Sequence, residues 1–475
     1  MFLACLRKEL LHNILSLRYA LIFLLFLSLT VAVTAVRTRI YTRQVADHTQ
    51  AVHELNAVSH MVRHALQSNA LGTTVEPAPN PMAIFAAGLE SEMTRAFWIR
   101  LGSTRSRDES TTVRLGLRKL NNYSFRYPYT VDIVLVVNLL CSLLAIALVF
   151  DAVSGERERG TLKVALAGPL PRDTVIISKL VSGLLTLLSP LVLSWVLCVL
   201  YVMYVGTVPI GAEELVRLGA IVVLSVLYLS FFFAMGMAAT CWLRGSATVL
   251  GVCLLLWVFF VLAVPTLVPA VVHFLAPVPA ESKIVLEKDA VTRSMWSNEV
   301  DSMEFELAES DVFENDGTYW FELVRRARLE QTRRFDKIDR YYAGCVQRQL
   351  RLTPAVSRLS PSAAFVYAAS HCAGTGAQDF TRLLKDVQDY IRAYGEKREE
   401  LEKVRLAEKR RREEAKEPGP WHDAYDPDAF PAFSRHRLDL PSVINHCWVD
   451  AVMLLGGTVL LFLISFVGFM RYDVQ

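Results

Sequence analysis

The chain has 475 residues, 53% of them hydrophobic, and a mean hydropathy of +0.33. That hydrophobic share exceeds what an ordinary soluble domain carries, so we expect part of the chain to lie in a membrane. The formal net charge is only +3, which gives no electrostatic reason to expect a nucleic-acid partner.

Six apolar runs come close to the length needed to cross a bilayer core of about 30 Å. Distinctly polar stretches separate these runs, so membrane-spanning and water-exposed parts alternate along the chain. The sequence therefore predicts an all-α membrane protein with six transmembrane helices. We place these spans at residues 17–36, 131–151, 175–205, 214–240, 247–272 and 448–470.

Residues 1–16 precede the first span and carry an apolar repeat at helical spacing. Leu3, Leu6, Leu10 and Ile14 share one face, which is typical of an amphipathic helix lying in the cytoplasmic interface. A frayed terminus is the alternative. A cleaved secretory signal is disfavoured, because the stretch before the apolar run is unusually long and the run reaches spanning length.

Lysine and arginine residues in the short loops and flanks indicate the orientation of the spans. They occur before span one, between spans two and three, between spans four and five, and after span six. With six spans these positions are all on one side, which is the cytoplasmic side, so we expect both termini in the cytoplasm. The two long polar segments, 37–130 and 273–445, are then expected outside.

Both outer segments favour helices. Residues 37–68 continue span one with helix-compatible sequence until Gly72 and the prolines from Pro77 onward, so span one is expected to extend as a stalk. Segment 273–445 has an apolar stripe at helical spacing followed by a strongly charged stretch, which predicts a helical hairpin or a small helical bundle. The stripe consists of Phe380, Leu383, Leu384, Val387, Ile391 and Tyr394.

Cys345 and Cys372 fall in the second outer segment, where a disulfide can persist. Because the sequence does not fix their separation in space, a bridge between them and two unpaired thiols are the two alternatives. No cysteines have the spacing of a zinc site. His60 and His64 have helical i, i+4 spacing but no third ligand nearby, so no metal site is expected.

Little in the chain suggests catalysis. Residues 155–161, GERERGT, resemble the glycine frame of a phosphate-binding loop, but Thr161 stands where a lysine must reach the phosphates. No nucleophile elbow occurs. The ionisable residues Asp132, Asp151 and Asp450 lie near the ends of spans, where an interfacial location explains them. We therefore expect no enzyme activity and no cofactor on this chain.

Span two and the loop after it resemble the corresponding part of type-2 ABC exporter permeases. The run FDAVSGERERGTL at 150–162 is similar to the cytoplasmic signature of that family, and 169–173 with 177–180 is similar to its return into the membrane. Three further stretches resemble the subgroup with large extracytoplasmic insertions after spans one and five, at 359–361, 373–376 and 469–474.

The resemblance implies a permease subunit of an ATP-driven exporter in the bacterial inner membrane, paired with a second permease copy that is identical or a paralogue. ATP and Mg²⁺ would bind separate cytoplasmic ATPase subunits, and membrane lipids and other envelope proteins would be further partners. Loop 152–174 would couple to the ATPase; a plain solvated loop is the alternative. The residues expected to dock are Gly155, Glu156, Arg157, Glu158, Arg159, Gly160, Thr161, Leu162, Pro169, Pro171 and Arg172.

A function of another class is a membrane-anchored sensor or scaffold of the envelope that uses the helical outer domain and moves no substrate. Sensitivity of a partner ATPase to changes in loop 152–174 distinguishes the two functions, because only the first depends on that loop.

Overall fold

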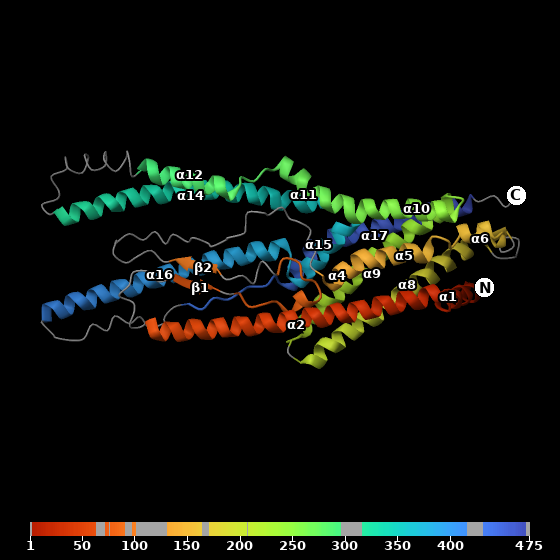
Figure 1. Ribbon diagram of the computed structural model, residues 1–475, viewed down its shortest axis with the longest axis horizontal. Helices are drawn as coiled ribbons and strands as arrows, with labels where there is room; N and C mark the ends of the chain where they lie inside the picture. The colour runs from red at the N-terminus through yellow and green to blue at the C-terminus, as the bar shows by residue number, and fades with distance from the viewer. Residues whose placement is uncertain are drawn as a thin grey trace.

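The computed structural model describes residues 2–62, 72–75, 77–90, 97–100, 131–163, 171–206, 208–295, 316–415 and 431–471. Within these residues six helices are long and apolar enough to cross a membrane, which confirms the predicted all-α membrane fold. Figure 1 shows an elongated bundle in which both chain ends lie at the same end as helix α6 (Ser154–Glu158). We call this end the α6 end and the opposite end the stalk end.

The first span is part of α2 (Leu17–Val62), which contains no glycine or proline and continues for 46 residues. At 1.5 Å per residue this helix is about 69 Å long, more than twice the thickness of a bilayer core. Its apolar first half is the spanning part, and its polar second half extends toward the stalk end (Figure 1). Helix α1 (Phe2–Ile14) precedes it and packs along α8 (Arg172–Val205), the third span.

Spans two and five are each interrupted by a π-helical turn. Such a turn contains one extra residue and leaves a backbone carbonyl without its usual helical partner. Inside a membrane that carbonyl needs another hydrogen-bond donor. Span two consists of α4 (Ile133–Val136), the π turn η3 (Val137–Cys141) and α5 (Ser142–Val149); span five consists of α10 (Ser246–Trp257), the π turn η4 (Val258–Ala263) and α11 (Val264–Leu275).

Helix α9 (Ala212–Trp242), the fourth span, is the centre of the bundle and packs against α5, α8, α10 and α17 (Leu440–Met470), the sixth span. Glycines allow the closest of these approaches. A Cβ atom on Gly183 of α8 would lie 2.2 Å from Phe233 Cζ of α9, and one on Gly236 of α9 would lie 2.2 Å from Val149 Cγ1. Small residues at such crossings let helices pack tightly where lipid gives no hydrophobic driving force.

Three further helices project with α2 toward the stalk end: α12 (Glu281–Ser294), α14 (Asp316–Ser357) and α16 (Ala377–Ala415) (Figure 1). Helix α14 packs against both α12 and α11. Two short antiparallel strands, β1 (Gly72–Val75) and β2 (Phe97–Arg100), pair with Gly72 opposite Arg100. The part beyond the spans is therefore mainly helical, as the sequence predicted.

Residues 77–90, which include the short helix η1 (Pro81–Ile84), form a buried turn at the stalk end of the spans. The Ala87 amide donates a hydrogen bond to Asp132 Oδ2 at 2.8 Å, which ties the turn to the start of span two. Glu90 is 1% exposed and pairs with both terminal nitrogens of Arg435, at 2.9 and 3.0 Å. This bidentate pair joins the turn to the chain that leads into span six.

Helix α15 (Pro361–Ala373) differs from the expectation that segment 273–445 lies wholly beyond the spans. It packs against both α9 and α17, and its N-terminal end meets Asn138, Tyr228 and Phe260. Those three residues are about 11–14 positions from the α6 ends of their spans, or roughly 17–21 Å into a core of about 30 Å. α15 contains no Asp, Glu, Lys or Arg, so it can be buried at that depth.

Candidate functional site

The docking residues expected from the sequence gather in and around α6, which begins directly after span two. Gly160 ends this short helix with φ +73°, a left-handed conformation that favours glycine. One helical turn follows at 161–163. Pro169 belongs to residues 164–170, which lie outside the described part of the chain.

Lys179 of α8 forms ion pairs with two carboxylates, one on α6 and one on α1. Its Nζ lies 2.6 Å from Glu156 Oε1 and 3.2 Å from Glu9 Oε1 of helix α1. The Lys179 side chain is 5% exposed, whereas the Glu156 and Glu9 side chains are 27% and 19% exposed. These three side chains, which we call the Lys179 triad, therefore form a largely buried ion-pair network that links α6, α8 and α1.

Arg157 fastens α6 to the end of span four. Its guanidinium donates hydrogen bonds to the Leu243 carbonyl at 2.9 Å and to the Cys241 carbonyl at 3.3 Å. Carbonyls at the C-terminal end of a helix lack intrahelical partners and carry partial negative charge. The positive Arg157 side chain satisfies two of them.

Glu158 fastens the same helix to the start of span five. Its Oε1 accepts a hydrogen bond from the Ser246 amide at 2.7 Å, and its Oε2 lies 2.9 Å from Ser246 Oγ. Ser246 is the first residue of α10, and the free amides at a helix N-terminus favour a carboxylate. Glu158 thus acts as a cap supplied from another part of the chain.

The C-terminal end of loop 152–174 contacts the end of span six. Pro171 is extended (φ −67°, ψ 141°) and immediately precedes α8, a position from which proline starts a helix without disturbing its hydrogen bonds. Arg172 Nη1 donates to the Met470 carbonyl at 3.2 Å. Residues of loop 152–174 therefore contact or continue into the α6 ends of spans two, three, four, five and six.

The outer side of the loop is polar and exposed at Arg159, Gly160, Thr161 and Lys163. Leu162 lies between them with its side chain fully buried, which anchors the turn. These exposed residues offer positive charge and hydrogen-bonding groups, but no nucleophile paired with a base is found among them. The loop therefore has a polar outer side that is exposed and an inner side that is held by the spans.

Sequence reasoning identified the loop but missed the residues that hold it, Glu9, Lys179 and Ser246. Lys179 did carry a signal, because a lysine eight residues into a helix that becomes a span needs a counter-charge if it is buried. Glu9 and Ser246 gave no signal of their own. Their roles arise only when α1 and α10 are brought beside α6.

A second group of polar residues lies inside the bundle, where α15 meets both π turns. Asn138 Oδ1 of η3 lies 2.7 Å from Tyr228 Oη and accepts from Ser362 Oγ at 2.8 Å. The Ser360 hydroxyl donates to the Phe260 carbonyl of η4. Tyr228 of α9 also donates to the Asn138 backbone carbonyl at 2.9 Å, so Tyr228 and Ser360, the N-cap of α15, each supply a donor to a carbonyl of a π turn. The contacts fix the N-terminal end of α15 to spans two, four and five.

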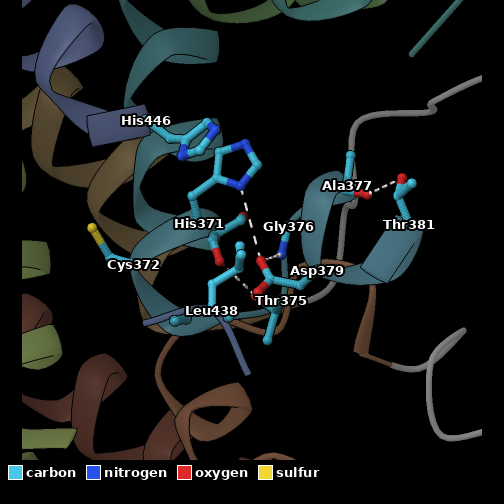
Figure 2. Close-up of polar contacts among 12 residues, drawn as sticks. His371, Cys372, Thr375, Gly376, Ala377, Asp379, Thr381, Leu438 and His446 are labelled. Carbon is cyan, nitrogen blue, oxygen red and sulfur yellow. Dashed lines mark hydrogen bonds and ion pairs between the residues drawn. The ribbon is translucent and has the colours of Figure 1, made fainter. Parts of the chain in front are cut away.

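His371 and Asp379 lie close together at the C-terminal end of α15, where the chain turns into α16 (Figure 2). His371 Nδ1 lies 4.0 Å from Asp379 Oδ2, which also accepts a hydrogen bond from the Gly376 amide at 3.3 Å. A Cβ atom on Gly376 would lie 2.4 Å from His371 Nδ1, so only glycine lets the turn approach the ring this closely. In the described part of the chain no three His, Cys, Asp or Glu residues are grouped so that they could hold a metal.

Cys345 and Cys372 are not bonded to each other, so the structure has the second of the two alternatives, two unpaired thiols. Both are free thiols; Cys345 lies on α14 and Cys372 on α15. Cys372 Sγ lies 3.5 Å from the sulfur of Cys447 on α17. The cause is the burial of α15 against spans four and six, which turns Cys372 toward span six. Figure 2 shows Cys372 pointing away from the His371 ring.

Comparison with protein families gives a match along nearly the whole chain. The family model described as ABC-2 family transporter protein matches residues 3–474. No curated protein matches the sequence.

Proposed function

Since the chain belongs to the ABC-2 family of transporter membrane proteins, we propose that it is the permease subunit of an ATP-driven exporter. Separate ATPase subunits bind ATP with Mg²⁺ and hydrolyse it, and a second permease, identical or a paralogue, completes the path of the substrate. The present chain contributes no catalytic group. Its part is to convert movement of the ATPase into movement of the spans.

One observation carries this proposal: loop 152–174 is connected to the α6 ends of five spans. Arg157, Glu158 and Arg172 contact spans four, five and six, and Lys179 extends the network to span three and α1. A partner that displaces such a loop displaces packed helices as rigid bodies, which a plain solvated loop could not do. Arg159, Thr161 and Lys163 form the surface that the partner contacts.

The α6 end faces the cytoplasm in this proposal, and the membrane is the bacterial inner membrane. The cluster of Lys and Arg in the short loops at this end supports the orientation. Both termini lie at the α6 end as well, as six spans require (Figure 1). The long helices of the stalk end then project into the extracytoplasmic space, where they meet envelope proteins.

Charge reversal on the outer side of the loop tests the coupling. The permease carrying Arg159→Glu is purified with its ATPase subunit, and ATP hydrolysis is compared with that of the unaltered complex. Because like-charge contacts at an interface are repulsive, we expect the ATPase to bind about tenfold more weakly and coupled hydrolysis to be lost. Lys283→Glu makes the same charge change at an exposed position on α12, at the other end of the molecule. Equal hydrolysis in both variants contradicts the proposal.

A sensor or scaffold of the envelope is the second candidate, favoured by the length of the stalk helices. Helix α14 has 42 residues, about 63 Å, and α16 has 39, about 59 Å. Helices of that length present a large surface to other envelope proteins. In this case Arg159→Glu leaves ATP hydrolysis unchanged, so the same experiment separates the two functions.

A further inference from the structure

Cys372 and Cys447 form a close pair of buried thiols that takes no part in the proposed coupling. Their sulfurs are 3.5 Å apart, and the residues are 2% and 6% exposed. Cys372 lies in the last turn of α15 and Cys447 in the second turn of α17. This is the one sulfur–sulfur contact found among the cysteines of the described chain; Cys198 and Cys241 contact hydroxyl groups instead.

The helix faces around this pair are shaped for close approach. Cys447 Sγ lies 3.4 Å from the Ala368 carbonyl, one turn before Cys372 on the same side of α15. Ala364 continues that side by a further turn, so the side of α15 that contains Cys372 also carries the small side chains of Ala364 and Ala368. A disulfide needs a sulfur–sulfur distance of about 2.05 Å. Rotation of the two side chains has to close the remaining gap of roughly 1.5 Å between sulfurs that already face each other.

We propose that Cys372 and Cys447 are oxidised to a disulfide on the extracytoplasmic side, which ties α15 covalently to span six. The proposal depends on the orientation given under the proposed function, because disulfides persist in that compartment and are reduced in the cytoplasm. The oxidant is a protein disulfide of the same compartment. It reacts with the pair before α15 is fully packed, since both thiols are buried afterwards.

The exchange is balanced in two steps. One cysteine of the pair, as its thiolate, attacks a sulfur of the oxidant disulfide, which forms a mixed disulfide and releases one oxidant thiol. The thiolate of the other cysteine then attacks the protein sulfur of that mixed disulfide and releases the second oxidant thiol. Two electrons and two protons pass from Cys372 and Cys447 to the oxidant, which ends as a dithiol.

The bond changes which parts of the chain move together. Arg358, just before α15, already pairs with Asp450 of α17, with Nε 2.6 Å from Oδ1. The disulfide adds a covalent link at the other end of α15, so that α15 and span six move as one body. When the spans move, α15 must then shift relative to α9 and the π turns, which it contacts on its other side.

Thiol trapping on the full chain in its native membrane tests the proposal. Membranes are quenched in acid, free thiols are blocked with N-ethylmaleimide under denaturing conditions, and the protein is then reduced and tagged with polyethylene-glycol maleimide. We expect two tags on the unaltered chain and none on Cys372→Ser or on Cys447→Ser. Cys345→Ser is the matched control and keeps both tags.

Digestion of the unaltered chain without reductant gives a second measurement that needs no variant to fold. It is expected to yield peptides linked between Cys372 and Cys447. An untagged chain, or tags that map to Cys345, overturns the proposal. The ATPase experiment with Arg159→Glu is independent of this one, so loss of coupling without tags leaves the exporter proposal standing and removes only the disulfide.

Discussion

Replacing Lys179 by methionine is the perturbation that most directly examines how α6 is held. Methionine keeps most of the side-chain volume but removes the amine that lies 2.6 Å from Glu156 and 3.2 Å from Glu9. Two carboxylates that shared one counter-charge are then left facing each other across the gap between α6 and α1. Their repulsion, and the loss of both ion pairs, favours release of α6.

The size of the effect follows from the exposure of the three side chains. Removing one partner of a fully buried ion pair costs roughly 3–5 kcal/mol. Here the carboxylates are 27% and 19% exposed, so water replaces part of what the amine supplied. We therefore expect Lys179→Met to lower the free energy of unfolding by about 2 kcal/mol.

A double-mutant cycle separates the ion pair from the loss of packing. The unfolding free energy of the detergent-purified chain is measured for Lys179→Met, Glu156→Gln and the two together. Because Glu156→Gln removes one of the two facing carboxylates, the double variant is expected to be about 1 kcal/mol more stable than the sum of the single effects predicts. Lys283→Met, at an exposed position outside the triad, should change stability by less than about 0.5 kcal/mol.

Additive effects of Lys179→Met and Glu156→Gln refute this reasoning. They would mean that the two side chains do not interact in the folded protein. α6 would then be held by Arg157 and Glu158 alone.

Two further predictions concern packing within the bundle. Gly183→Ala is expected to lower the thermal unfolding midpoint, because its Cβ would lie 2.2 Å from the Phe233 ring and overpacking typically costs about 1–3 kcal/mol. The control is Gly219→Ala on α9, which has no atom within 4 Å of the new Cβ and should be neutral or stabilising. Equal midpoints for the two variants would contradict the close approach of α8 and α9. Tyr228→Phe keeps the ring stacked on Phe365 at 4.5 Å but loses the hydroxyl that contacts Asn138. The free energy of unfolding should therefore fall by roughly 0.6–1.7 kcal/mol. An unchanged value would show that the π turn does not need this donor.

The membrane part of the fold is largely predictable from the sequence because a bilayer imposes a length on every apolar run. Part of the chain beyond the membrane was predictable too: because there is no glycine or proline from Leu17 until Gly72, helix α2 was expected to continue beyond the first span. The π turns in spans two and five were not predictable, since η4 is as apolar as its surroundings and η3 differs from them only by Asn138, which by itself does not predict a π turn. Their carbonyls accept hydrogen bonds from Tyr228 of α9 and from Ser360, the N-cap of α15, and these contacts appear only in the folded chain.

Helix α15 could have been found within segment 273–445 but was assigned with its polar neighbours. Its thirteen residues include no Asp, Glu, Lys or Arg, and a run of that length is too short to span yet long enough to be a buried helix. Reading the segment as one unit hid this contrast. Cys345 was the one candidate partner considered for Cys372, because Cys447 lies beyond the segment, in the helix of span six.

Loop 152–174 was singled out by resemblance, and the contacts that hold it were visible only in three dimensions. Alternating charges at 156–159 are compatible with full solvation. In the structure Glu156, Arg157 and Glu158 each contact a different helix, whereas Arg159 is exposed. No spacing rule pairs Glu158 with a residue 88 positions away.

Accessibility of Thr161 tests the central claim that the loop held by five spans faces the cell interior. Cysteine is introduced at Thr161 or, as the control, at Lys283, both of which are exposed, and intact cells are treated with a maleimide that cannot cross the membrane. We expect the reagent to label Lys283→Cys and to leave Thr161→Cys unlabelled until the cells are permeabilised. Labelling of Thr161→Cys in intact cells, with Lys283→Cys protected, would place α6 outside and contradict its coupling to a cytoplasmic ATPase.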